Sequence, residues 1–137
     1  MKERNKYMTY EEVFSKSKEI IMASDVSGIE GHLAVEVDIV GEGEGAFYIE
    51  LLDGALYVEP YEYYDNDCKF IVSANDFLKM ADGSLDSVFA FTTGRLKVEG
   101  SIDKALEFQK IVEAVKKKQK KAAKTNKKTS VKKSARA

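Results

Sequence analysis

Apolar and polar positions alternate along residues 9–115 with two periods, one typical of helices and the other of strands. The helical period is clearest near the end of this stretch, where apolar residues stand at i, i+3, i+4 and i+7: Phe108, Ile111, Val112 and Val115. This spacing predicts an amphipathic helix over residues 103–115. An earlier helix is predicted to begin at Tyr10, because residues 9–12 read Thr-Tyr-Glu-Glu, which is a capping box.

Strict alternation over residues 32–40 predicts a strand with one apolar face, formed by Leu33, Val35, Val37 and Ile39. Ala34, Glu36 and Asp38 point the other way, and we expect this second face to be exposed to water. Residues 46–52 and 55–59 are predicted as strands, because Asp53-Gly54 between them is a strong hairpin signal. These three strands are expected to form a meander, and residues 68–72 and 95–99 supply two further strands.

Two short helices are predicted between the fourth and fifth strands. Ser73 is a suitable N-cap for the first of them, which ends at Asp82-Gly83. The second covers residues 86–93, and Gly94 follows it as a turn residue. Five strands and about four helices predict an α+β fold, in which helices pack on one face of the sheet.

The end of this pattern has a recognisable order of residues: Phe91-x-x-Gly94-x-Leu96-Lys97-Val98-x-Gly100, followed by a helix with Ala105 and Ile111. This order resembles the sterol carrier protein 2 (SCP-2) family of lipid-binding domains over about thirty residues. Asp86 stands where that family opens a short helix with an acidic or amide residue. Residues 90–92 read Ala-Phe-Thr where Ala-Phe-Phe is common, so the second aromatic ring is missing.

The resemblance implies a five-stranded mixed, largely antiparallel sheet with helices on one face and an elongated apolar cavity between the two layers. It also implies a lipid-binding role for eight apolar side chains of the helical layer: Phe77, Met80, Phe89, Phe91, Leu106, Phe108, Ile111 and Val112. Their helical spacing alone is typical of an ordinary core. Two interpretations therefore stay open at this point, a cavity that holds a ligand and a core filled by its own side chains.

Charge is distributed very unevenly along the chain. Residues 116–137 contain eleven Lys or Arg and no acidic residue, whereas residues 1–115 hold the other eleven basic residues and all 23 acidic ones, a net charge of −12. We expect a lipid-binding domain over residues 1–118 and a lysine-rich disordered tail over residues 119–137. Five lysines at this junction are candidates for contact with an anionic membrane: Lys116, Lys117, Lys118, Lys120 and Lys121. The same tail can bind nucleic acid non-specifically, or the acidic body of its own or another copy.

Little in the sequence points to catalysis. His32, the single histidine, begins a strand with no identifiable partner, and Cys68 is expected to be a small buried or half-buried residue. Glutamates alternate with the glycines of residues 41–45, which favours a flexible hairpin loop over a phosphate-binding loop. We expect no enzyme activity, no cofactor and no bound metal.

Targeting signals are also missing from the sequence. A lone cysteine excludes an internal disulfide, and we find neither a secretory leader nor an apolar run of eighteen residues. We therefore expect a soluble, cytoplasmic protein. The leading hypothesis is a non-catalytic domain that binds or transfers a fatty acyl, sterol or phospholipid molecule. The alternative is a regulatory or interaction module with a filled core, whose basic tail binds nucleic acid or another anionic partner.

Overall fold

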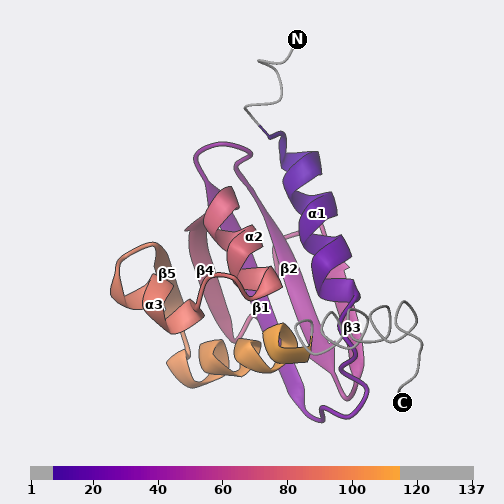
Figure 1. Ribbon diagram of the computed structural model, residues 1–137. Coiled ribbons are helices and arrows are strands. Elements are labelled where there is room, and N and C mark those ends of the chain that lie inside the picture. The colour runs from indigo at the N-terminus through magenta and orange to yellow at the C-terminus, as the bar shows by residue number, and fades with distance from the viewer. Residues whose placement is uncertain (1–7, 115–137) are drawn as a thin grey trace, which may run out of the picture.

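One sheet of five strands runs through the molecule in the order β3-β2-β1-β4-β5 (Figure 1). The computed structural model describes residues 8–114 of the 137-residue chain. The labelled elements are α1 Tyr10–Met22, β1 His32–Val40, β2 Gly45–Leu52, β3 Ala55–Glu59, β4 Cys68–Ser73, α2 Ala74–Asp82, α3 Ser87–Thr92 and β5 Leu96–Gly100. A further helix, which we call the closing helix, begins at residue 102 and continues to residue 114, where the described part ends.

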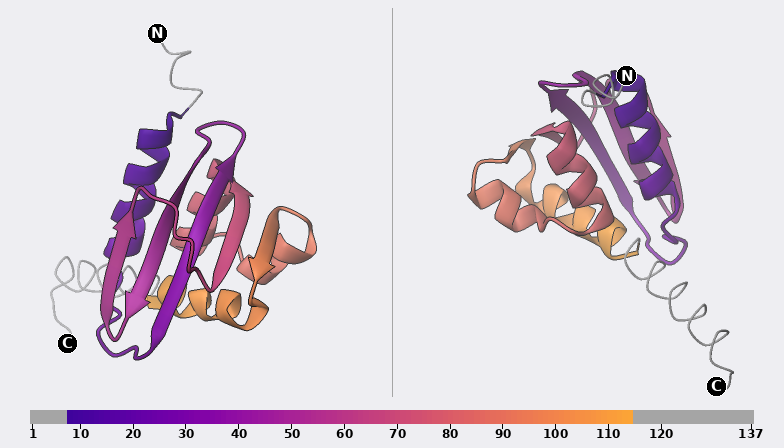
Figure 2. Two further views of the ribbon diagram at one scale, coloured as in Figure 1. Left: turned by 180° about the vertical axis from the view of Figure 1, so that it is seen from behind. Right: turned by 45° about the horizontal axis from the view of Figure 1, so that its top comes forward.

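The sheet is mixed and largely antiparallel, which confirms the prediction. β1 pairs antiparallel with β2 and parallel with β4, so that Val35 lies between Ile49 and Cys68. The pairs β2–β3 and β4–β5 are antiparallel, and β1, β2 and β3 form the predicted meander. α1, α2 and the closing helix cover one face, as Figure 1 and the right view of Figure 2 show. The parallel pair arises because the chain leaves β3 at one edge and crosses the opposite face before it enters β4.

Side chains at the helix starts satisfy backbone groups that a helix leaves unpaired. Thr9 and Glu12 form the predicted capping box of α1. The hydroxyl of Ser73 accepts a hydrogen bond at the start of α2, and the carboxylate of Asp86 does the same for α3. At the start of the closing helix, the hydroxyl of Ser101 accepts a hydrogen bond from the amide of Lys104, at 3.1 Å. The sequence therefore specified these starts locally.

Five phenylalanines form a row of ring contacts through the core between the sheet and the helices. Phe47 of β2 meets Phe14 of α1 and Phe77 of α2 at 5.6 Å between ring centroids in each case. Phe108 of the closing helix continues the row, 6.2 Å from Phe77 and 5.2 Å from Phe70 of β4. Most of these contacts are edge to face, the geometry that aromatic quadrupoles prefer. The row ties three helices to the sheet.

The outer face of the sheet, opposite the helices, is less exposed than its alternation predicts. Ala34 and Glu36 are buried, because residues 60–67 cross β1 on this side (Figure 2, left). The Ala34 amide donates to the Asp67 carboxylate at 2.7 Å, and the Tyr63 amide donates to Glu36 at 2.9 Å. The prediction of a fully wet face is therefore wrong at β1, where a distant loop supplies the cover. Within residues 8–114, no helix is long and apolar enough to span a lipid bilayer.

Candidate functional site

An apolar pocket of about 80 Å³ lies between α3, β5 and the closing helix. Its lining residues are Phe70, Ser87, Val88, Phe91, Leu96, Val98, Ile102, Ala105, Leu106 and Gln109. Four of the large apolar ones remain between 45% and 52% exposed: Val88, Phe91, Ile102 and Leu106. The pocket therefore opens to solvent through an apolar mouth, which we define as these four side chains.

The mouth arises from the sequence of α3, which reads Ser-Val-Phe-Ala-Phe-Thr. Apolar residues occupy four consecutive positions and so point around the whole helix, whereas a helix on a surface can bury only one side. Ala90 is the one buried residue of α3. Val88 and Phe91 line the pocket. The guanidinium carbon of Arg95 lies over the ring of Phe89, 5.9 Å from the centre of that ring.

The closing helix provides the opposite wall with a second stripe of residues. Ile102, Ala105, Leu106 and Gln109 follow the i, i+3, i+4, i+7 spacing and all line the pocket. The stripe that the sequence analysis singled out, through Phe108 and Ile111, faces the core instead. Of this second stripe, Leu106 alone was among the predicted lipid-binding residues, although the spacing of the stripe is a signal that can be found in the sequence.

The eight predicted lipid-binding residues separate into two groups. Phe91 and Leu106 line the pocket, and Phe89 lies exposed on α3 beside them. The other five are buried in the core: Phe77, Met80, Phe108, Ile111 and Val112. The two groups meet at Phe70, which lines the pocket and also contacts the ring of Phe108. The structure thus brings the pocket and the core together at one shared wall.

Two polar side chains interrupt the apolar lining. The Oγ atom of Ser87 and the Oε1 atom of Gln109 are shielded from solvent, and neither has a hydrogen-bond partner within residues 8–114. None of the ten lining residues carries a charge. A ligand can therefore reach these two oxygens only where the walls separate, and it finds no counter-ion in the lining.

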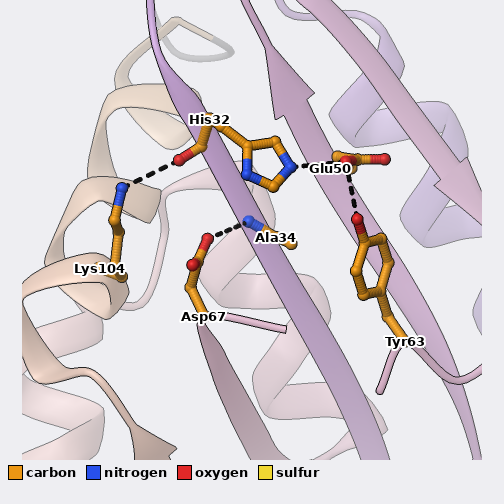
Figure 3. A network of polar contacts seen from close by, with 6 residues as sticks. All are labelled: His32, Ala34, Glu50, Tyr63, Asp67 and Lys104. Atoms are coloured by element: carbon orange, nitrogen blue, oxygen red, sulfur yellow. Dashed lines mark hydrogen bonds and ion pairs between the residues drawn. The ribbon is translucent and has the colours of Figure 1, made fainter. Parts of the chain in front are cut away.

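His32 has a partner after all, which corrects the expectation from the sequence. Its Nε2 atom lies 2.6 Å from Oε2 of Glu50, which also accepts a hydrogen bond from the Tyr63 hydroxyl at 2.9 Å (Figure 3). Lys104 of the closing helix donates to the backbone oxygen of His32 at 3.0 Å. This network, drawn in Figure 3, links β1, β2, residues 60–67 and the closing helix, and none of its members lines the pocket.

Burial raises the pKa of two further groups on the sheet, Cys68 and Asp38. Cys68 is buried, and burial raises the pKa of its thiol to about 11, so the thiol stays protonated at neutral pH. On the outer face, Lys69 lies 3.6 Å from Glu36 and 3.8 Å from Asp38. Burial raises the pKa of Asp38 to about 6, and the adjacent Glu36 carboxyl, with which it can share a proton, adds to the rise. Across residues 8–114 no cluster of three or more potential ligands is arranged to hold a metal ion.

Comparison with known proteins gives a consistent picture. Residues 11–113 match the SCP-2 sterol transfer family. The chain is 30% identical over 78 residues to hydroxysteroid dehydrogenase-like protein 2 of Mus musculus, an alignment that covers 56% of this chain and 16% of that protein. The chain thus spans less than a fifth of the length of this relative.

Two solved structures illustrate the shared fold. A stereoselective inverting sec-alkylsulfatase from Pseudomonas sp. matches with a TM-score of 0.57 at 18% identity, over 65% of this chain and 14% of that chain. A palmitated form of SCP2L2 from Aedes aegypti matches with a TM-score of 0.51 at 17% identity, over 77% of this chain and 95% of that chain. At these identities the likeness concerns the fold alone.

Proposed function

Since this chain belongs to the SCP-2 sterol transfer family, a family of lipid-binding and lipid-transfer domains, we propose that it holds the apolar part of a lipid in the pocket between α3 and the closing helix. The observation that carries this proposal is the apolar mouth. Four half-exposed large side chains from two elements surround one concave, uncharged site. Clustered exposure of this kind marks binding sites on soluble proteins, whereas scattered apolar residues do not.

The volume of the pocket sets what it accepts without rearrangement. Its 80 Å³ is about half of the roughly 150 Å³ cavity that holds a benzene molecule. A complete acyl chain therefore enters only if the walls separate. α3 is the wall that can move at small cost, because Ala90 is the one side chain that it buries fully.

The hydrophobic effect supplies enough free energy for such opening. Each buried methylene contributes about 0.8 kcal/mol, so an acyl chain of about sixteen carbons supplies on the order of 10 kcal/mol before ordering costs. Micromolar affinity requires about 8 kcal/mol. Fatty acyl, sterol and phospholipid ligands all remain within this proposal, because burial of their apolar parts provides binding free energy in the same way.

We regard the domain as a carrier without catalytic activity of its own. The Cys68 thiol is buried and protonated, and His32 pairs with Glu50 away from the pocket lining. No lining residue is a base or a charged group. Any reaction on the bound lipid would be carried out by another domain or protein. The mouse relative and the alkylsulfatase both extend well beyond the part that this chain matches.

The second part of the proposal is that the basic tail contacts anionic membranes. Its five candidate lysines, Lys116–Lys118, Lys120 and Lys121, lie outside the described residues, and so does the predicted domain boundary at residue 118. They follow directly on the closing helix, which forms one wall of the pocket. A lysine near an anionic bilayer contributes about 1 kcal/mol, so three or four contacts suffice for transient docking.

The experiment that tests lipid binding compares two leucines of similar exposure. Leu106, 52% exposed, lines the pocket, whereas Leu52, 44% exposed, lies at the end of β2 outside it. We expect Leu106→Asn to weaken binding of a fluorescent acyl probe at least fivefold, because about 1 kcal/mol or more of transfer free energy is lost. Leu52→Asn serves as the matched control and should bind like the wild type. Equal binding by the two variants would show that the pocket is not the lipid-binding site.

A further inference from the structure

The pocket contains an unexplained polar feature at its shielded part. Ser87 begins α3 and Gln109 lies on the closing helix, so the two come from opposite walls. They are the only polar residues among the ten that line the pocket. Both side-chain oxygens are buried without a hydrogen-bond partner among the described residues.

Such groups are few in native proteins, because a buried polar atom without a partner costs stability. Among the described residues Ser17 and Asp38 also have such an oxygen, but neither of them lines the pocket. Apolar side chains at the two pocket positions would extend the surrounding surface of Val88, Ile102 and Leu106 without this cost. Their presence in a pocket that is otherwise apolar therefore points to an occupant with hydrogen-bonding capacity of its own.

Resting on the lipid-binding function proposed above, we propose that Ser87 and Gln109 select a ligand whose buried end is a neutral hydroxyl group. A hydroxyl is both donor and acceptor. Once the walls separate enough to admit a ligand, such a hydroxyl can donate to Oε1 of Gln109 and accept from the hydroxyl of Ser87, so that both oxygens gain a partner. The hydrocarbon of the ligand then covers the apolar mouth.

Other headgroups fit these two atoms less well. An ionised carboxylate has no proton to donate to Gln109, and no cationic side chain lines the pocket to compensate its charge. An ether oxygen only accepts, so it leaves Oε1 of Gln109 unpaired. A plain hydrocarbon leaves both atoms unpaired. The expected order of preference is alcohol before ether, with the carboxylate disfavoured at neutral pH.

Two isomeric probes isolate the headgroup: decanol and methyl nonyl ether contain the same atoms. Their affinities for the full chain are measured by displacement of a fluorescent acyl probe, in the wild type and in the double variant Ser87→Ala/Gln109→Met. Comparing the ratio of the two affinities between proteins cancels the different hydration of the free probes. We expect the ratio to shift toward the ether by about tenfold in the variant, which corresponds to one hydrogen bond to a buried group. The affinity for the ether should itself fall, by up to about tenfold, because the ether loses the one hydrogen bond that it accepts from Ser87.

A stability measurement separates this role from a structural one. Because the variant removes two unpaired buried oxygens, we expect the ligand-free variant to unfold at the same or a higher temperature than the wild type. A structural hydrogen-bonding role would instead lower the unfolding temperature. Ser15→Ala, at an exposed position of α1, is the control for an ordinary loss of a hydroxyl.

The outcomes distinguish this inference from the function on which it rests. If neither isomer nor the fluorescent probe binds the wild type, the lipid-binding proposal itself fails. If all of them bind, but wild type and variant show the same ratio, the pocket stands and the headgroup inference is wrong. That second result would assign the two oxygens to an ordered water molecule, which also requires two to four polar partners. Binding of decanoate at pH 8 as tight as that of decanol would contradict the inference as well.

Discussion

The ring of Phe70 meets that of Phe108 edge to face, with 5.2 Å between their centroids, and Phe70 also lines the pocket. Phe70 is therefore the wall between the pocket and the core, and the row of phenylalanines ends where the pocket begins. Phe108 was predicted to touch a ligand, but it lies behind this wall, fully buried. The size of the pocket thus depends on a core residue of β4.

Replacing this wall should lengthen the pocket. We expect Phe70→Leu to lower the free energy of unfolding by about 1–2 kcal/mol and to raise the affinity for longer acyl chains relative to shorter ones, because the space behind it opens toward Phe108. Phe47→Leu is the matched control: Phe47 is also fully buried in the sheet, but it does not line the pocket. Chemical denaturation and a series of acyl chain lengths measure both effects. An identical chain-length profile in the two variants would show that Phe70 does not limit the pocket.

The raised pKa of Asp38 predicts how stability depends on pH. Asp38 binds its proton more tightly in the folded protein, with a pKa of about 6, than its ordinary value of 3.8. Its contribution to stability is therefore fully present below about pH 3.8 and is lost as the pH rises through about 6. Above this window the carboxylate is ionised next to Glu36, and Lys69 compensates only in part.

We therefore expect Asp38→Asn to be more stable than the wild type at pH 7.5 by about 1 kcal/mol, a value discounted because the side chain is partly exposed to screening solvent. The difference between the two proteins should shrink toward pH 4. Denaturation midpoints across this range measure it, with Asp65→Asn in the exposed loop as the control. A wild type that gains stability relative to Asp38→Asn as the pH rises would reverse the assigned sign.

The thiol of Cys68 should not react with thiol reagents while the protein is folded. Burial holds its thiol protonated up to a pKa of about 11, and its side chain is shielded by the core. We expect labelling by an aromatic disulfide reagent at pH 8 to proceed only at the rate of unfolding, and to become complete within seconds in denaturant. Rapid labelling under native conditions, with the protein still folded by circular dichroism, would reopen the question of a reactive thiol.

The tail should control membrane contact but not ligand uptake. Residues 119–137 carry eight of the eleven basic residues of the C-terminal segment. We expect their deletion to reduce binding to vesicles with anionic lipid at least tenfold and to remove most of its salt dependence, while uptake of the fluorescent acyl probe is unchanged. A tail of the same composition in scrambled order should restore vesicle binding, because the attraction depends on charge alone. Vesicle binding that survives the deletion would exclude the tail as the docking element, and tight retention on nucleic acid instead would favour the alternative partner.

Much of the fold is predictable because its signals are local. The capping box at Thr9, the alternation along β1 and the Asp53-Gly54 hairpin each depend on a few neighbouring residues. In the hairpin both turn residues adopt positive φ, 44° for Asp53 and 84° for Gly54, as a tight primed turn requires. The predicted bounds of the strands and the predicted starts of α1, α2 and α3 therefore agree with the observed ones to within one residue.

The pocket was harder to predict because helical spacing does not show which of two stripes meets the sheet. The closing helix has one stripe through Phe108 and another through Ile102 and Leu106. Tertiary packing of Phe108 against the rings of Phe70 and Phe77 decides which stripe enters the core. Five of the eight expected residues consequently belong to the core. The burial of Glu36 was equally inaccessible, because the loop that covers it comes from residues 60–67, far along the chain.

Methyl-resolved NMR with isotope-filtered contacts between protein and ligand tests the central claim most directly. With decanol bound, the account predicts contacts from the ligand chain to the methyl groups of Val88, Ile102 and Leu106, and none to the buried Val13 and Ile21 of α1. Ligand contacts to those two α1 methyls, without contacts to the mouth, would place the lipid elsewhere between the layers and contradict the account.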